Sequence, residues 1–177
     1  MKQLKLISKS LLALTLLIGV MVTANAQKDK SNRPSPPAQA KATVDGVDVT
    51  VDYSQPAVKD RKVWDNLVPY GKVWRTGANE ASWIEVSSDV KVGGKTLPKG
   101  KYGLFTIPGE DEWTIIFNET WNQWGAYDYD SEKDVLRITA KPKKSDSFSE
   151  RFTVDISDDG LVSLKWEDLT VPFDIDK

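Results

Sequence analysis

Cysteine and histidine are both absent from this chain of 177 residues, and their absence excludes several kinds of chemistry. Without cysteine there is no disulfide, no thiol nucleophile and no site for a bacterial lipid anchor. Without histidine there is no Ser-His-Asp triad, no histidine general base and no ordinary zinc or copper site. We therefore expect no metal and no cofactor, and any catalysis would use carboxylates, Lys, Arg, Tyr, Ser or Thr.

The chain also lacks an excess of positive charge and has few long hydrophobic runs. The net charge of −2 argues against nucleic acid as a partner, because neutralising phosphates requires a basic face. The one long apolar run, residues 11–22, is shorter than the roughly 20 residues that cross a bilayer. Lysines precede it and Ala24-Asn25-Ala26 follows, which predicts a signal peptide over residues 1–26, cut after Ala26. We expect a periplasmic or secreted protein without a stable membrane anchor.

The remainder divides into a short leader and one domain. Residues 27–38 are polar and carry Pro34, Pro36 and Pro37, which predicts a disordered or extended Pro-rich leader. Residues 39–177 are long enough for a single domain with its own core.

Alternating hydrophobicity is the main fold signal in that domain. Val47, Val49, Val51 and Tyr53 alternate with polar residues, the period of a half-buried strand, and Asp45-Gly46 before them is typical of a tight hairpin. The other predicted strands lie at 72–74, 82–86, 89–92, 95–97, 101–107, 113–117, 135–140, 148–156, 161–166 and 169–175. The fold class is therefore all-β, an antiparallel, jelly-roll-like β-sandwich of about nine or ten strands.

The first candidate site lies in residues 75–80. Gly77 permits a sharp turn, so that Arg75, Asn79 and Glu80 can converge. The planar guanidinium of Arg75 suits a carboxylate, a phosphate or sugar hydroxyls, and Glu80 is an acceptor or a weak candidate for a general acid or base. The alternative is an Arg75–Glu80 salt bridge that only holds a loop in place.

The second candidate site lies in residues 121–130. It interleaves Trp121, Trp124 and Tyr127 with Gln123 and with carboxylates. Aromatic faces offer stacking area and amides offer directed hydrogen bonds, a mixture that suits carbohydrate rings. The alternative is a loop folded over one end of the sandwich, with at least one of its tryptophans anchored in the core.

A run of acidic residues follows at Asp128, Asp130, Glu132 and Asp134. A calcium loop needs a turn-forming glycine and a later bidentate glutamate, and Lys133 stands where that glycine is required. The run predicts a solvated acidic turn and no metal site.

Several longer motifs resemble a known family. They are Y-S-Q-P at 53–56, V-P-Y-G-K-V-W-R-T-G-A-N-E-A at 68–81, L-P-K-G-K-Y-G-L-F-T-I-P at 97–108, W-T-I-I-F-N at 113–118, and the aromatic residues around 123–127. Together they resemble the secreted bacterial family called Domain of Unknown Function 2911, over nearly all of residues 41–175. The resemblance implies a secreted, β-rich domain of Gram-negative bacteria. It implies no activity and transfers no catalytic residue.

Three functions are open at this point. The first is a periplasmic or secreted domain that binds a small polar molecule or glycan through Arg75, Asn79, Glu80 and the aromatic segment. The second is a carboxylate-dependent hydrolase or lyase acting on carbohydrate, with Glu80 paired with Asp128 or Asp130. The third is a structural domain of the cell envelope without a small ligand.

Overall fold

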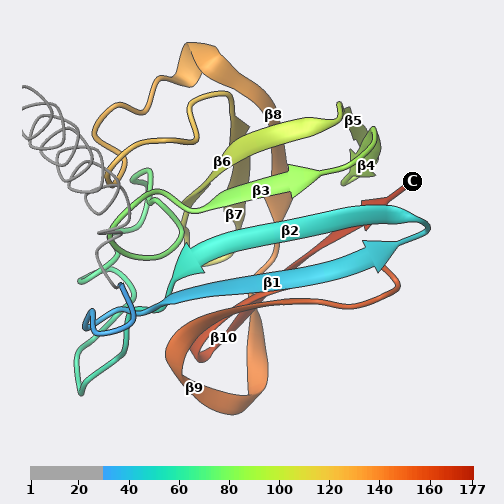
Figure 1. The fold of residues 1–177 in the computed structure, drawn as a ribbon. Helices are drawn as coiled ribbons and strands as arrows, with labels where there is room; N and C mark the ends of the chain where they lie inside the picture. The colour runs from blue at the N-terminus through green and yellow to red at the C-terminus, as the bar shows by residue number, and fades with distance from the viewer. Residues whose placement is uncertain (1–29) are drawn as a thin grey trace, which may run out of the picture. The chain divides into compact units, whose positions relative to one another are not determined.

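Ten β-strands in two antiparallel sheets form this fold in the computed structural model, which describes residues 30–177 (Figure 1). The predicted all-β sandwich is confirmed. The six-stranded sheet has the order β1 (Pro37–Val44), β2 (Val47–Ser54), β3 (Trp83–Val86), β6 (Gly100–Ile107), β7 (Trp113–Asn118) and β8 (Asp134–Ala140). The four-stranded sheet has the order β5 (Lys95–Leu97), β4 (Val90–Val92), β10 (Leu161–Asp176) and β9 (Lys143–Ile156). A short 3-10 helix, η1 (Ser131–Lys133), precedes β8.

The predicted signal peptide, residues 1–26, and the first three residues of the predicted leader lie outside the described residues. Within residues 30–177, no helix has the length and apolar character needed to cross a membrane.

Local sequence explains the first hairpin. Val49 and Val51 are fully buried, whereas the alternate residues Asp48, Thr50 and Asp52 are exposed or half-buried. Asp45 and Gly46 both have positive φ, 47° and 79°, which matches the twist of a two-residue hairpin turn. The register therefore pairs β1 with β2 over the whole length of both strands, and one face of the hairpin covers the core.

The core lies between the two sheets, and strand β7 is buried on both of its faces. Trp113, Ile115 and Phe117 of β7 belong to the main core, while Ile116 packs in a smaller cluster with Phe105 on the other face of the sheet. The continuous apolar run of residues 113–117 predicts this arrangement. Residues 119–133 contribute Ala126 and Tyr129 to the smaller cluster, so this loop covers the outer face of β6 and β7.

Two of the strand predictions are wrong: a strand at residues 72–74, and a break between residues 161–166 and 169–175. Residues 72–74 do not form a strand, because Trp74 makes only an isolated bridge with Thr106 before the chain turns away. Residues 161–166 and 169–175 form one strand, β10, because register shifts on either side of Glu167 absorb the polar break. Glu167 has a φ of 53°, typical of an irregularity in a strand. The same shifts carry Phe148 of β9 away from the core, and its side chain is 62% exposed.

The leader and the loop after β2 bring several segments to one end of the sandwich. Strand β1 begins at Pro37, inside the predicted leader, and Gln55 N donates to Pro36 O. Residues 56–58 then lie alongside β9, because Phe152 N donates to Pro56 O and Val58 N donates to Glu150 O. In Figure 1 the loops between β2 and β3 gather where β1 begins, at the left of the view.

Candidate functional site

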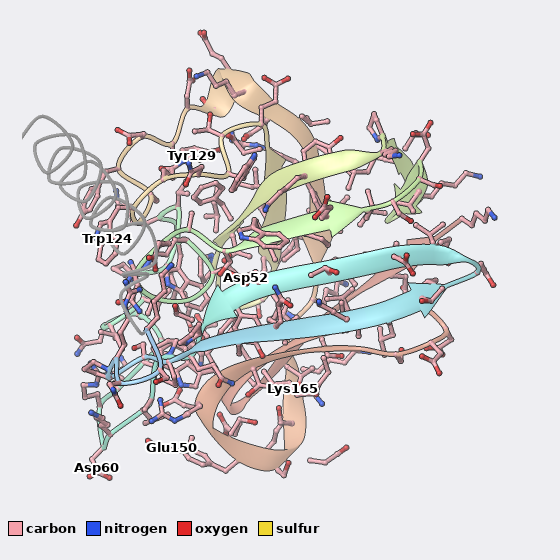
Figure 2. All side chains as sticks on the ribbon, in the orientation of Figure 1. Asp52, Asp60, Trp124, Tyr129, Glu150 and Lys165 are labelled. Atoms are coloured by element: carbon pink, nitrogen blue, oxygen red, sulfur yellow. The ribbon has the colours of Figure 1, made fainter. Side chains whose placement is uncertain are left out.

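The two predicted segments, residues 75–80 and 121–130, lie side by side. Glu80 and Trp124 form an antiparallel bridge. On either side of this bridge, Ala81 N donates to Gln123 O and Gly125 N donates to Asn79 O, each over 3.0 Å. The backbone pairing therefore joins two segments that are far apart in the sequence, as a single binding site formed by both of them requires. Trp124 and Asp60, which belongs to the loop after β2, both lie at this end of the sandwich (Figure 2).

Residues 75–80 form a tight backbone turn, called the arch below, which close contacts hold in place. Gly77 has a φ of 153°, and a Cβ atom there would lie 2.9 Å from Ser82 Oγ and 3.0 Å from Ser54 O. Ser82 Oγ donates to Thr76 O over 2.7 Å, and Thr76 Oγ1 bonds Thr106 Oγ1 over 3.2 Å. Glycine is required at this position by both the backbone conformation and the close approach.

Arg75 and Glu80 do not form the salt bridge considered from the sequence. Glu80 Oε2 lies 2.7 Å from Arg33 Nη1, in the leader. Arg75 O accepts from Ser82 N, but within residues 30–177 the side chain of Arg75 makes no hydrogen bond or ion pair, and its Nε is buried without a partner. Burial lowers the pKa of Arg75, and the electrostatic effect of Tyr127 opposes that shift. Arg75 is therefore a half-buried cation whose guanidinium has no protein partner among the described residues and whose Nε is shielded from solvent.

Arg75 lines a pocket of about 200 Å³ at this end of the sandwich. Two tryptophans, Trp74 and Trp166, form apolar walls and stack with ring centroids 5.9 Å apart and an interplanar angle of 15°. A second arginine, Arg61, lines the same pocket. The remaining lining residues are Ser35, Pro56, Leu67, Val68, Gly77 and Ala78.

A cluster of tryptophans lies behind these walls. The ring of Trp64 contacts those of Trp74, Trp113 and Trp166 at centroid distances of 6.3, 5.2 and 5.8 Å, all edge-to-face. Trp74 Nε1 donates to Gly77 O over 3.1 Å, which ties the cluster to the arch. The indole N–H groups of Trp64, Trp113 and Trp166 are buried without a partner. Buried polar groups are almost always paired, so three such donors close together are unusual.

The other predicted ligand residues in the arch hold the leader in place. Asn79 Nδ2 donates to Ser35 O over 3.0 Å, and Glu80 pairs with Arg33. The guanidinium of Arg33 also lies 5.9 Å from the ring centroid of Trp124. The leader residues Arg33 and Ser35 therefore form one side of the site, which the composition of residues 27–38 did not predict.

The predicted aromatic segment divides into exposed and internal members. Trp124 is 55% exposed and Tyr127 is 85% exposed, so both remain open to a partner. Gln123 is buried, donates from Nε2 to Thr120 O and accepts from Asp128 N, which holds the loop together. Trp121 packs on Trp83, away from the residues that line the pocket.

Trp121 belongs to a separate cluster on the sheet. Lys101 Nζ lies 3.4 Å from the ring centroid of Trp83 and 3.9 Å from that of Trp121, so a lysine is held between two aromatic faces. Gly103 on β6 lets the backbone of residues 120–121 lie close to the strand, since a Cβ atom there would lie 2.8 Å from Thr120 O and 3.3 Å from Trp121 Cα. This cluster holds the loop against the sheet, but Trp121 is half-buried and belongs to neither core cluster, so it is not the core anchor considered from the sequence.

The candidate catalytic carboxylates have other contacts or lie in solvent. Glu80 is paired with Arg33, and Asp128 is exposed. Asp130 caps η1, because its Oδ1 accepts from Glu132 N over 2.9 Å. Among the described residues, no group of three or more acidic residues is arranged to hold a metal ion.

Asp134 is the centre of a further polar network in this loop. Its Oδ2 accepts from Tyr129 Oη over 2.8 Å and from Arg137 Nε over 2.6 Å, and its Oδ1 accepts from Asn118 Nδ2 over 2.7 Å. Burial, together with the bond to Asp134, raises the pKa of Tyr129 to about 12. The network holds the end of the loop to the start of β8.

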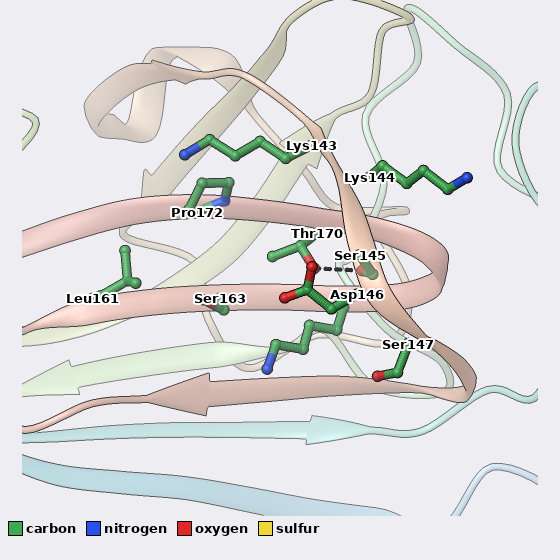
Figure 3. Close-up of a pocket in the computed structure, with 10 residues that line it drawn as sticks. Lys143, Lys144, Ser145, Asp146, Ser147, Leu161, Ser163, Thr170 and Pro172 are labelled. Atoms are coloured by element: carbon green, nitrogen blue, oxygen red, sulfur yellow. Dashed lines mark hydrogen bonds between the residues drawn. The ribbon is translucent and has the colours of Figure 1, made fainter.

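A second and larger pocket of about 390 Å³ lies in the curled β9–β10 hairpin (Figure 3). Ser145 Oγ and Thr170 Oγ1 bond across it over 2.5 Å. Lys143 and Lys144 point in opposite directions in Figure 3, and Lys165 pairs with Asp155 over 2.7 Å. Since its lysines do not converge, this pocket is a weaker candidate than the one beside Arg75.

Sequence reasoning missed Arg61, Trp74 and Trp166 as parts of one pocket. Arg61 lies in a charged connector, and the two tryptophans read as core residues of separate strands. The only available signal was the density of tryptophan, since seven such residues follow the predicted signal peptide.

Comparisons with known proteins give a family and no activity. A search of curated proteins found no match. A search of solved structures found none either. Residues 35–175, which contain every strand except the last residue of β10, match one family, and the chain therefore belongs to the family described as "Protein of unknown function (DUF2911)".

Proposed function

We propose that this chain is an exported binding domain that holds a small polar molecule, or one residue of a glycan, in the pocket beside Arg75. The observation that carries the proposal is the state of Arg75, whose Nε is buried and unpaired at the wall of a pocket of about 200 Å³. A partly desolvated charge without a partner costs free energy, and a bound acceptor would offset that cost.

The surroundings of Arg75 suit a ligand with both apolar and polar parts. Trp74 and Trp166 offer apolar walls, and the exposed rings of Trp124 and Tyr127 lie on the neighbouring segment. Ligand pockets commonly combine an apolar lining with a few convergent polar groups. Aromatic side chains also provide stacking area for the C–H faces of sugars.

Intrinsic tryptophan fluorescence tests this function, because Trp74 and Trp166 line the pocket. The protein should be titrated with monosaccharides, oligosaccharides, cell-wall fragments, small carboxylates and phosphate. We expect a saturable change in fluorescence with at least one probe. No response to any member of the panel would contradict the proposal and would favour a structural domain of the envelope.

The alternative of a carboxylate-dependent hydrolase has less support. It needs two carboxylates that face one scissile bond, about 5 to 10 Å apart. Glu80 is bound to Arg33, and Asp130 caps a helix, so neither carboxylate is free for that role. No observation in the site favours catalysis over binding.

A further inference from the structure

We infer that the pocket beside Arg75 selects ligands that carry an oxyanion, either a carboxylate or a phosphate group. This inference rests on the proposed binding function and narrows its ligand class. Sequence reasoning left carboxylates, phosphates and neutral sugars equally open.

The charge of the lining is the first observation. Two arginines, Arg61 and Arg75, line the pocket, and no aspartate or glutamate does. Neither arginine forms an ion pair within residues 30–177. Two uncompensated guanidinium groups beside one small cavity favour a negatively charged occupant, and guanidinium pairs with carboxylate or phosphate in a two-pronged geometry.

The unused donors are the second observation. Arg75 Nε is buried without an acceptor, and so is Nε1 of Trp166, whose side chain is only 1% exposed. Both residues line the pocket. The guanidinium and the indole can donate hydrogen bonds but cannot accept them, so a ligand that pairs with either group must supply an acceptor. A neutral sugar hydroxyl can fill that role, but an oxyanion offers more acceptor sites and a compensating charge.

Arg61 is held in a way that leaves part of its guanidinium available. Its Nε donates to Val58 O over 3.0 Å, and its Nη2 donates to Ala57 O over 2.5 Å. These bonds to the backbone orient the planar group, while Nη1 has no protein partner among the described residues. An oriented guanidinium loses less side-chain freedom on binding, which favours recognition.

The size of the pocket limits what enters. Pockets for drug-sized ligands range from about 300 to 1,000 Å³, whereas this pocket has about 200 Å³. It therefore suits a small acid, or the anionic end group of a larger molecule, better than an oligosaccharide. The remainder of a larger ligand would extend toward solvent.

A matched series of probes tests the ligand class. Glucose, glucuronate and glucose 6-phosphate share a ring and differ in charge, and inorganic phosphate lacks the ring. Each should be titrated into the full mature chain by calorimetry and tryptophan fluorescence. We expect at least one of the three anions to bind about tenfold or more tightly than glucose. A preference for glucuronate indicates a carboxylate ligand, and a preference for either phosphate probe indicates a phosphate ligand.

Variants tie any binding to the pocket. Arg75→Met should abolish anion binding, and Arg75→Lys should weaken it, because lysine keeps the charge but loses the planar fork. Trp166→Phe removes the indole N–H and should also weaken binding. Lys91→Met is the charge control, because Lys91 is exposed on β4 and is not a lining residue. Circular dichroism and thermal unfolding of each variant separate loss of binding from loss of fold.

The outcomes separate this inference from the proposed function. If glucose or another neutral sugar binds as tightly as the anions, the pocket binds ligands but the oxyanion class is wrong. The class is also wrong if an anion binds equally well to folded Arg75→Met. If no probe in either panel binds, both the ligand class and the binding function are contradicted.

Discussion

The carboxylate of Glu80 lies 2.7 Å from Nη1 of Arg33 and leaves Arg75 unpaired, although Arg75 is only five residues away along the chain. Glu80 thus fastens the leader to the arch and does not form an ion pair with Arg75. Because Glu80 pairs with Arg33, the guanidinium of Arg75 has no protein partner among the described residues. That free guanidinium makes the pocket beside Arg75 a candidate binding site.

The Arg33–Glu80 pair should contribute little to overall stability. Their side chains are 27% and 39% exposed, and ion pairs of this kind contribute about 0.2–1 kcal/mol. A double-mutant cycle of Arg33→Ala and Glu80→Gln, measured by urea unfolding, should give a coupling free energy in that range. A coupling above about 2 kcal/mol would show that the leader is an integral part of the core.

Replacing Arg75 by methionine should stabilise the protein. Methionine keeps an unbranched, flexible side chain but removes a half-buried charge that has no partner among the described residues, so the free energy of unfolding should rise by about 1 kcal/mol. Urea unfolding of wild type, Arg75→Met and Arg75→Lys gives the comparison, and the lysine variant should show no gain. Residues kept for function often cost stability, so a gain in Arg75→Met agrees with a binding role. A loss of stability in Arg75→Met would mean that Arg75 stabilises the fold.

Alanine at Gly77 should damage the arch. The new Cβ atom would meet Ser82 Oγ at 2.9 Å and Ser54 O at 3.0 Å, in a backbone conformation that almost only glycine adopts, so we expect a loss of about 2–4 kcal/mol. Gly94→Ala is the matched control, since Gly94 has a φ of 77° but no atom within 4 Å of the added Cβ. That control should lose about 1 kcal/mol. Equal losses in thermal or urea unfolding would refute the steric argument.

Tyr129 should make stability sensitive to alkaline pH. Its pKa in the folded protein is raised to about 12, above the ordinary value of 10.0, so the folded state holds this proton more tightly than the unfolded chain does. Its contribution is complete below about pH 10 and is lost as the pH rises from about 10 to 12.

The control for this prediction is Tyr129→Phe, which removes the phenol. The variant should lose stability at neutral pH and show a smaller further loss between about pH 10 and 12 than wild type does. The difference in phenolate absorbance between the two proteins isolates the titration of Tyr129 from that of the other tyrosines. A difference spectrum with a midpoint near the ordinary tyrosine pKa would contradict the effect assigned to burial and Asp134.

Local patterns were sufficient to predict most of the sheet. The alternation of Val47, Val49 and Val51, and the turns at Asp45-Gly46 and Gly93-Gly94, depend on neighbours within a few residues, and the structure confirms the strands that they define. The sequence predicted two strands in place of β10, because polar residues interrupt the alternation near Glu167. In the structure the strand continues through them, since its pairing with β9 shifts register on either side of Glu167.

The candidate site was predicted in part. Both candidate segments, residues 75–80 and 121–130, were found from the sequence, and the structure places them side by side. The pocket, however, is lined by several other segments, and no sequence motif links them. Arg61, Trp74 and Trp166 come together only when β9, β10 and the loop after β2 are assembled. Their contact is tertiary, and no spacing in a single sequence encodes it.

The most direct test of the central claim is the NMR signal of the Arg75 side-chain Nε–H during a titration with glucuronate or glucose 6-phosphate. Loss of a peak in Arg75→Lys assigns that signal, and Trp166→Phe assigns the indole N–H of Trp166 in the same spectrum. We predict that both signals shift in a saturable way with one of these anions, while the Nε–H of Arg137, already bound to Asp134, stays in place. Unchanged Arg75 and Trp166 signals at saturating concentrations of both anions would contradict the account.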